Sequence, residues 1–345
     1  MLWITSGLFQ NYPQVCTLTG LPLWGVEFEP MKLTVRIVGV LLLACAIFGV
    51  AGVLATWAPD KSVESLSARW AKPPSQFMEV NGMQVHLRDE GPREDTVPIV
   101  LLHGTSASLH TWDGWTQSLD VQRRVIRFDL PAFGLTGPHP TNDYSIAAYV
   151  HFVNAVLDKL GVASCVLVGN SLGGQIAWGM ALAHPQRVSR LVLVDSAGYP
   201  LQSTSVPIGF RIARTPGLRV LAERTLPRGV VDSSVRNVFG DPSKVTSELV
   251  DRYYDLTLRS GNRKALAYRM EQRVSGDEAQ IKRLKLPTLI LWGAKDYLIP
   301  LKNAHRFAAD IQDSRLVVFE NLGHVPQEEG AQETVKALKT FLDLR

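Results

Sequence analysis

The serine at position 171 has the clearest chemical signature in the chain. It stands in the pattern Gly-x-Ser-x-Gly at residues 169–173, with an apolar, β-branched run at 165–168 before it and a helix-forming run at 175–182 after it. In a strand, sharp turn and helix of this kind, the serine has a strained backbone and projects from the top of a sheet, where the helix dipole favours negative charge. The pattern marks Ser171 as a candidate nucleophile; the alternative is a strand–helix connection that merely contains a serine.

A nucleophilic serine needs three partners. Its hydroxyl attacks poorly until a base takes the proton, and the pKa of histidine suits that task near neutral pH. The imidazolium that forms needs a carboxylate to orient and stabilise it, and the oxyanion of the tetrahedral intermediate needs two backbone N–H donors. The rest of the chain must therefore supply a histidine, an acid and an oxyanion loop.

Runs of apolar residues predict a buried sheet that positions such groups. They lie at 98–102, 125–130, 165–170, 189–195, 286–292 and 314–319. Two alternating runs around Asn81-Gly82 predict a hairpin before them, and residues 145–160, with Gly161 as a stop signal, predict a helix between them. Continuous apolar strands that alternate with helices predict a mostly parallel sheet with helices on both faces.

Residues 197–283 interrupt this alternation. They contain no strand-like run and show helical periodicity, most clearly over 244–270. Because they lie between two core strands, we expect them to form an inserted helical cap that divides the core into 76–196 and 284–345.

Five motifs resemble those of the α/β-hydrolase family, in the same order and spacing. They are Leu102-His103-Gly104, Asp129 with Gly134, Gly169 to Gly174 around Ser171, the run WGAKDYLIP from Trp292 to Pro300, and the run GHVPQEE from Gly323 to Glu329. The resemblance covers residues 76–345 and is strongest to bacterial serine esterases and lipases with a helical cap. It implies the α/β-hydrolase fold.

The resemblance also implies a catalytic triad of Ser171, Asp296 and His324. His324 follows the last strand, at the position of the family's base, and Asp296 follows the preceding strand, at the position of its acid. Asp195 is the rival acid, because it ends the strand after the nucleophile and some family members place their acid there. Asp129 is expected to be structural.

The family pattern assigns the oxyanion hole to two backbone N–H groups. One belongs to Leu172, directly after the nucleophile, and the other to Thr105, after His103-Gly104. Ser106 is the alternative to Thr105, because sequence does not fix which amide points inward. His103 is expected to shape this loop through hydrogen bonds.

Departures from relatives narrow the expected reaction. Haloalkane dehalogenases and epoxide hydrolases of this fold use an aspartate nucleophile, whereas this chain has Ser171. Carbon–carbon hydrolases of ring-cleavage pathways commonly have tryptophan after the catalytic histidine, whereas Val325 stands there. We therefore expect a serine hydrolase that cleaves hydrophobic short-to-medium-chain carboxylic esters. Hydrolysis of carbon–carbon or amide bonds with the same triad is the alternative, and a non-catalytic binding protein of this fold is a more remote one.

Composition points away from several other functions. The net charge is +4, and no Lys/Arg block with interleaved aromatic residues occurs, so we expect no nucleic-acid partner. The three cysteines, Cys16, Cys45 and Cys165, suggest neither a disulfide framework nor a metal cluster. No metal or phosphate-loop motif is present, so we expect no cofactor; the oligomeric state stays open.

An uncharged apolar run at 37–55 is about long enough to cross a bilayer as a helix. Lys32 and Arg36 precede it, and Trp57 follows it like an interfacial anchor. We expect residues 31–57 to be a single-pass anchor, with the catalytic part on the periplasmic or extracellular side. A cleaved signal peptide and a lipoprotein signal ending at Cys45 are the alternatives.

The segments on either side of the anchor differ in character. Residues 1–30 carry no Lys or Arg, and Met31 resembles a natural translation start, so we expect a disordered N-terminal extension. Residues 58–75 are polar and contain three prolines, which predicts a stalk between anchor and hydrolase core.

Overall fold

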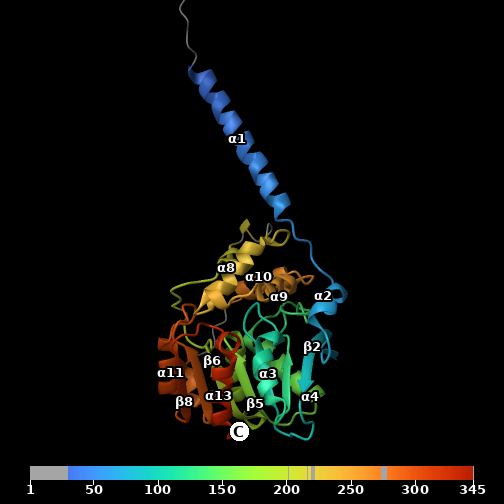
Figure 1. Cartoon of the computed structure of the whole chain (residues 1–345), viewed down its shortest axis with the longest axis vertical. Coiled ribbons are helices and arrows are strands. Elements are labelled where there is room, and N and C mark those ends of the chain that lie inside the picture. Colours follow the sequence, from blue (N-terminus) through green and yellow to red (C-terminus); the bar gives the residue numbers. More distant parts are fainter. Residues whose placement is uncertain (1–29, 201, 216, 219–221, 273–277, 345) are drawn as a thin grey trace, which may run out of the picture. The chain divides into compact units, whose positions relative to one another are not determined.

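An eight-stranded sheet runs through the part of the chain that follows the apolar segment (Figure 1). Its strands are β1 (Gln76–Val80), β2 (Met83–Glu90), β3 (Ile99–Leu102), β4 (Val125–Phe128), β5 (Cys165–Asn170), β6 (Val188–Val194), β7 (Thr288–Gly293) and β8 (Ser314–Phe319). Their order is β1-β2-β4-β3-β5-β6-β7-β8. Only β2 runs antiparallel to its neighbours, and every other pair is parallel. The predicted mostly parallel sheet is confirmed.

This structure is a computed structural model that describes residues 30–200, 202–215, 217–218, 222–272 and 278–344. The chain divides after Gly52 into two compact units, and the sheet belongs to the second. The extension expected before residue 30 lies outside the described residues.

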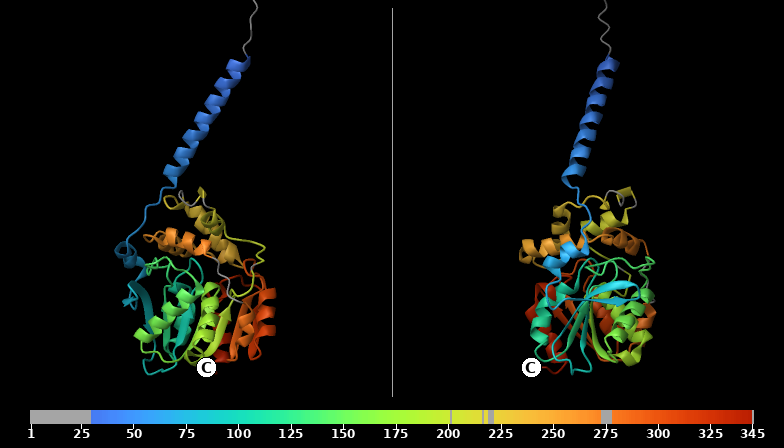
Figure 2. Two further views of the ribbon diagram at one scale, coloured as in Figure 1. Left: turned by 180° about the vertical axis from the view of Figure 1, so that it is seen from behind. Right: turned by 90° about the vertical axis from the view of Figure 1, so that its right-hand side faces the viewer.

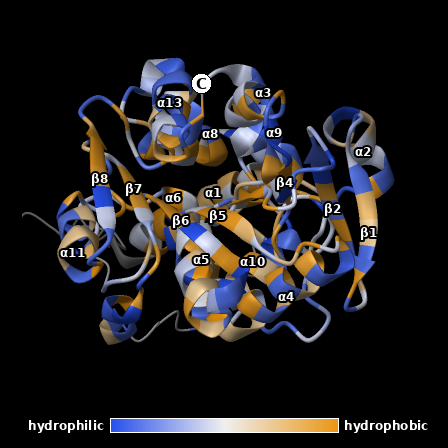
Figure 3. Ribbon diagram, turned by 90° about the horizontal axis from the view of Figure 1, so that it is seen from below, coloured by the Kyte–Doolittle hydropathy of each residue, from blue (hydrophilic) through white to orange (hydrophobic). Residues whose placement is uncertain are grey.

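Helices cover both faces of the sheet, as predicted. Figure 3 shows α3 and α13 on one side and α4, α5 and α11 on the other. Their bounds are α3 (Asp113–Leu119), α4 (Ile146–Lys159), α5 (Leu172–Ala183), α11 (Lys302–Asp310) and α13 (Ala331–Phe341). Alternate residues of β5 serve the two sides: Cys165 and Leu167 pack in one apolar cluster, and Val166 and Val168 in the other. Burial on both faces explains why the strands are continuously apolar.

Among its described residues, the segment between β6 and β7 contains no strand, two short 3₁₀ helices and four α-helices. The α-helices are α6 (Ile208–Arg214), α8 (Arg228–Val238), α9 (Ser247–Thr257) and α10 (Asn262–Glu271). Figure 2 shows this cap lying across the end of the sheet opposite to the C-terminus. Gly261 separates α9 from α10 with φ of +87°, a conformation that favours glycine.

Residues 58–75 differ from the expected stalk, because they contain helix α2 (Val63–Trp70), which packs on the cap. Leu66 and Trp70 are buried in one cluster with Leu256 of α9. The Trp70 Nε1–H donates to Asp255 Oδ2 at 3.0 Å, and Lys61 Nζ forms an ion pair of 2.7 Å with the same carboxylate. Two apolar residues spaced by four in a polar run were too short a pattern to predict this packing.

Helix α1 spans Pro30–Ala55 and belongs mostly to the first of the two units. Residues Thr34–Ala55 have a mean hydropathy of 2.8 over the most apolar window, and none of that window is buried. Its 22 residues suffice to cross a membrane by length and composition, a property that signal sequences near an N-terminus share.

Candidate active site

The turn between β5 and α5 holds Ser171 in a strained conformation, with φ of +54° and ψ of −114°. Positive φ is rare for a residue with a Cβ and occurs where surrounding structure imposes it. The two flanking glycines allow the close approach of neighbouring chain. A Cβ at Gly169 would lie 2.1 Å from Gly173 O, and one at Gly173 would lie 2.2 Å from Leu102 O. The Gly-x-Ser-x-Gly pattern thus reflects steric necessity.

Asp296 and His324 meet beside the ends of β7 and β8. His324 Nδ1 lies 2.7 Å from Asp296 Oδ2, and both side chains are buried. The other oxygen, Oδ1, accepts backbone N–H bonds from Leu298 at 2.8 Å and Ile299 at 2.9 Å. The carboxylate is therefore held by two fixed donors while it accepts the Nδ1–H of His324, which leaves Nε2 for proton transfer.

Asp195, the rival acid, lies beside this pair without binding the histidine. It is fully buried, and its Oδ1 accepts the Gly293 N–H at 3.0 Å. Its Oδ2 has no hydrogen-bond partner among the described residues. One ligand atom each of Asp195, Asp296 and His324 lie within 4.8 Å of one another. Burial, followed by the adjacent carboxylate of Asp296, raises the pKa of Asp195 well above its usual range, which favours the protonated form of Asp195.

Two polar residues that sequence reasoning did not single out hold the histidine loop. Asn170 Nδ2 donates to the His324 carbonyl at 3.0 Å and thereby ties the end of β5 to this loop. The Glu329 carboxylate accepts the N–H of Gly323 at 2.8 Å and two more from residues 240 and 241 of the cap. Asn170 belongs to the motif around Ser171, and Glu329 belongs to the motif around His324. Their hydrogen-bond partners are distant in sequence, so no local pattern indicates these contacts.

The loop expected to supply the second oxyanion donor lies next to the nucleophile. A Cβ at Gly104 would come within 3.1 Å of Ser171 Cβ, so the chain before Thr105 passes close to the serine. Leu172 is the first residue of α5, and N–H groups of a first helical turn lack acceptors within the helix. Ser106, the alternative donor, has φ of +61°.

His103 fixes this loop, as expected. Its Nδ1 lies 2.7 Å from Gly104 O, and its Nε2 accepts the Leu130 N–H at 2.9 Å. These two bonds set one neutral tautomer. Burial lowers the pKa of His103 and keeps the ring uncharged.

Asp129 anchors a second buried network. It accepts the Leu109 and Leu135 N–H groups at 2.7 and 2.8 Å, and His86 Nδ1 lies 2.8 Å away. Burial alone would raise the pKa of Asp129, but the His86 imidazole and its hydrogen bond outweigh it and hold the pKa well below the usual range. The Asp129 carboxylate therefore holds loops together, and no contact among the described residues joins it to His324.

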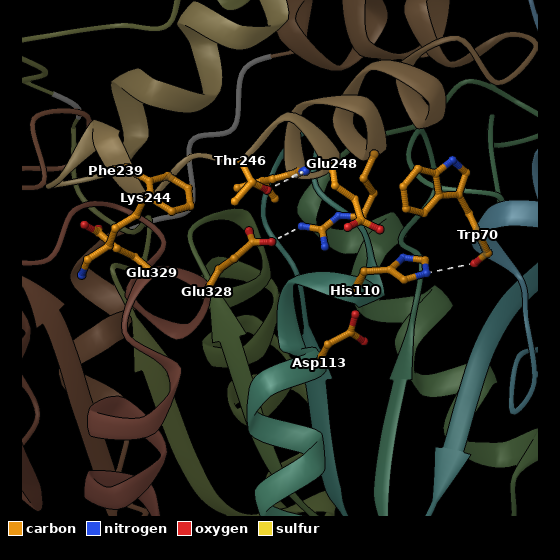
Figure 4. A pocket seen from close by; sticks show the side chains of 11 residues that line it. Trp70, His110, Asp113, Phe239, Lys244, Thr246, Glu248, Glu328 and Glu329 are labelled. Carbon is orange, nitrogen blue, oxygen red and sulfur yellow. Dashed lines mark hydrogen bonds and ion pairs between the residues drawn. The ribbon is translucent and has the colours of Figure 1, made fainter.

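A separate cavity of about 420 Å³ lies between α2, α9 and the short helix α12 (Pro326–Glu329), as Figure 4 shows. None of the triad candidates lines it. Within it, Glu328 forms an ion pair with Arg252 and accepts the Tyr253 hydroxyl at 2.9 Å. His110 Nε2 lies 2.9 Å from Trp70 O.

A family model described as the alpha/beta hydrolase fold matches residues 97–331 of the chain. The chain is an α/β-hydrolase. The predicted fold and family resemblance are therefore confirmed, and hydrolase chemistry is the activity that the family carries.

Relatives of this α/β-hydrolase act on different bonds. A 2-hydroxymuconate semialdehyde hydrolase of Pseudomonas sp. (strain CF600) is 31% identical over 272 residues, which are 76% of this chain and 91% of the relative. The solved meta-cleavage product hydrolase of Pseudomonas fluorescens IP01 has a TM-score of 0.66 and 25% identity, over 78% of this chain and 97% of that chain. A bacterial membrane phospholipase A has a TM-score of 0.67 over 90% of this chain and 98% of that chain; at 24% identity it shows the fold alone.

Proposed function

We propose that this α/β-hydrolase is a serine hydrolase that cleaves carboxylic esters with hydrophobic, short-to-medium-chain acyl groups through an acyl-enzyme on Ser171. The observation that carries the proposal is the 2.7 Å bond between His324 Nδ1 and Asp296 Oδ2, at the sheet end where Ser171 stands in its strained turn. His324 is assigned as the base and Asp296 as the acid that orients it.

Each group has a defined task in this mechanism. His324 Nε2 takes the Ser171 proton as Oγ attacks the ester carbonyl, and Asp296 stabilises the imidazolium. The N–H groups of Leu172 and Thr105 are assigned to the oxyanion. The imidazolium then gives its proton to the departing alcohol, which leaves the acyl group on Ser171. Water, activated by the same histidine, attacks that acyl group and releases the acid.

Val325 supports esters over carbon–carbon bonds. It directly follows the assigned base and packs in the apolar cluster of Phe239 and Val250 from the cap. Ring-cleavage hydrolases commonly have tryptophan at this position. Val325 is buried in that cluster and lacks the aromatic ring that those enzymes place next to the base.

Carbon–carbon hydrolysis is the second candidate, favoured by the relatives and by Arg269. The buried arginines of the described chain are Arg127, Arg263 and Arg269. The first two form ion pairs, whereas Arg269 has only Tyr149 as a hydrogen-bond partner and no carboxylate among the described residues. A buried guanidinium on the cap helix α10, with no carboxylate partner among the described residues, suits a substrate that carries a carboxylate, such as the dienoates of ring cleavage.

Parallel kinetics decide between the two. The purified enzyme is assayed with p-nitrophenyl butyrate and with 2-hydroxy-6-oxohepta-2,4-dienoate, together with Arg269→Gln and the exposed control Lys264→Gln on the same helix. We expect a far larger kcat/KM for the ester, with both variants close to wild type. A larger kcat/KM for the dienoate, with a KM raised only by Arg269→Gln, would replace the ester proposal.

We further propose that α1 is a retained single-pass anchor, with the hydrolase on the periplasmic or extracellular side. Its support is the uncharged length of residues 37–55 and the cations Lys32 and Arg36 before it. Full-length protein should stay in membranes after alkaline carbonate extraction, and a protease added to intact spheroplasts should digest the catalytic part. Recovery of a mature N-terminus at Cys45 or beyond would show processing.

A further inference from the structure

The cap is bonded to the residues that directly follow the apolar helix. Thr56 O accepts the Leu226 N–H at 3.0 Å, and Ala58 N–H donates to Arg224 O at 3.0 Å. Between these bonds, Trp57 and Thr225 form an antiparallel bridge. All these residues belong to the unit that begins at Val53. The chain entering α8 is therefore fixed to the three residues after Ala55, where α1 ends.

With α1 as the proposed anchor, few residues separate this bridge from the membrane. Twenty-two residues at about 1.5 Å each span about 33 Å, close to the roughly 30 Å of a hydrocarbon core. Ala55 would then lie at the edge of the bilayer, and Trp57, which is 53% exposed, at the level of the headgroups. Three residues span at most about 11 Å. If α1 spans a membrane up to Ala55, residues 224–226 must lie within that reach of the lipid surface.

The cap carries the charge that an anionic surface attracts. Residues 197–283 contain 15 of the chain's 36 Lys and Arg but only 9 of its 32 Asp and Glu. Arg211, Arg214 and Arg224 are exposed, and none forms an ion pair with a described residue. Arg228, by contrast, is paired with Asp251. The unpaired cations thus lie close in sequence to the segment that is tied to α1.

Apolar side chains accompany these cations. Helix α6 contains no buried residue, and its Ile208 is 36% exposed. Leu218 is 45% exposed. Exposed apolar residues among arginines are typical of segments that lie in a membrane interface.

We propose that the outer face of the cap, defined as Ile208, Arg211, Arg214, Leu218 and Arg224, rests on the membrane that holds α1 and binds the phosphates of anionic lipids. The proposal rests on the proposed anchor and is independent of which bond the enzyme cleaves. It orients the cap toward the lipid, so that a substrate dissolved in the bilayer reaches the cap without crossing bulk water.

Fluorescence quenching tests this contact in the full-length protein. Cys16 and Cys45 are replaced by serine and alanine, and a nitrobenzoxadiazole probe is attached at Leu218→Cys or, as control, at Val121→Cys, which is 81% exposed between α3 and β4. The proteins are reconstituted in vesicles of phosphatidylcholine with 30% phosphatidylglycerol and spin-labelled lipid. We expect strong quenching at position 218 and none at 121. Equal quenching at both positions, or none at 218, overturns the proposal.

Charge variants test the lipid specificity. The triple variant Arg211→Gln/Arg214→Gln/Arg224→Gln is compared with Lys159→Gln/Arg315→Gln/Lys336→Gln, three exposed cations of the core. Each neutralised surface arginine weakens attraction to anionic lipid by roughly fivefold, so only the cap variant should lose quenching, as should wild type in 0.5 M salt. Unchanged quenching in the cap variant would exclude anionic headgroups as the ligand. Circular dichroism spectra and melting temperatures close to wild type in both variants show that they are folded, and this control does not depend on the proposed reaction.

Discussion

Asp296 and Asp195 are both buried beside His324, and exchanging each for asparagine separates their roles. Asp296 accepts three hydrogen bonds, from His324 Nδ1–H and from the N–H groups of Leu298 and Ile299. An asparagine at 296 has one carbonyl oxygen for these donors. If that oxygen keeps the two backbone bonds, its NH₂ group faces His324 and forces the tautomer in which Nε2 carries the proton.

The expected losses differ by orders of magnitude. The wrong tautomer cannot take the Ser171 proton, so Asp296→Asn should lower kcat by about 10⁴-fold, or about 5 kcal/mol of transition-state stabilisation. The raised pKa of Asp195 favours its protonated form, and an amide offers the same combination of an acceptor and a donor. Its oxygen can still accept the Gly293 N–H, so Asp195→Asn should change kcat/KM by less than about threefold.

Stability against pH gives a second readout for Asp195. Its pKa is raised in the folded state, so above the unfolded value near 3.8 the native protein binds more protons than the unfolded chain, and the free energy of unfolding falls as pH rises. Asp195→Asn removes this penalty. The melting temperature of Asp195→Asn should therefore rise relative to that of wild type as the pH increases from 4 to 8. A large kcat loss in Asp195→Asn with little in Asp296→Asn would show that the acid has been assigned to the wrong residue.

Three further predictions follow from the same contacts. Ser171→Ala and His324→Ala should each remove nearly all turnover, and the double variant should be little worse than either, because the two act as one unit; additive losses in kcat would separate their mechanisms. With p-nitrophenyl esters, kcat/KM should rise from acetyl to butyryl or hexanoyl, since each buried methylene contributes about 0.8 kcal/mol, and then level off; a continuous rise to long chains would indicate a lipase, and strict acetyl preference a small pocket. Burial lowers the pKa of His110 to about 3, so between pH 6.5 and 4 the unfolded chain binds the extra proton and the native state loses about 3 kcal/mol. His110→Gln should lose less thermal stability than wild type over that range, and equal losses would refute the assignment.

The parts of the site that local chemistry determines could be predicted from sequence. Any side chain at Gly169 or Gly173 would collide with a backbone oxygen. The two glycines around Ser171 therefore indicate a tight turn directly from the sequence. The acid and base were predicted from family motifs that follow two strands. Their 2.7 Å contact depends on β7 and β8 being neighbours in the sheet.

Long-range packing accounts for what the sequence could not reveal. Whether Asp195 or Asp296 binds His324 depends on a difference of a few ångströms among groups within 4.8 Å of one another. The clamp of Glu329 on Gly323 and the cap joins segments about ninety residues apart. Trp70 of α2 is buried because it packs with Leu256 of the cap and donates its Nε1–H to Asp255.

The most direct test of the central claim, that Ser171 is the nucleophile of this hydrolase, is labelling with a fluorophosphonate probe followed by mass spectrometry of the modified peptide. Wild type should carry one phosphonyl group on Ser171, with loss of ester hydrolysis in proportion to labelling, and Ser171→Ala should remain unlabelled. Labelling of another serine, or undiminished hydrolysis by Ser171→Ala, would contradict the account.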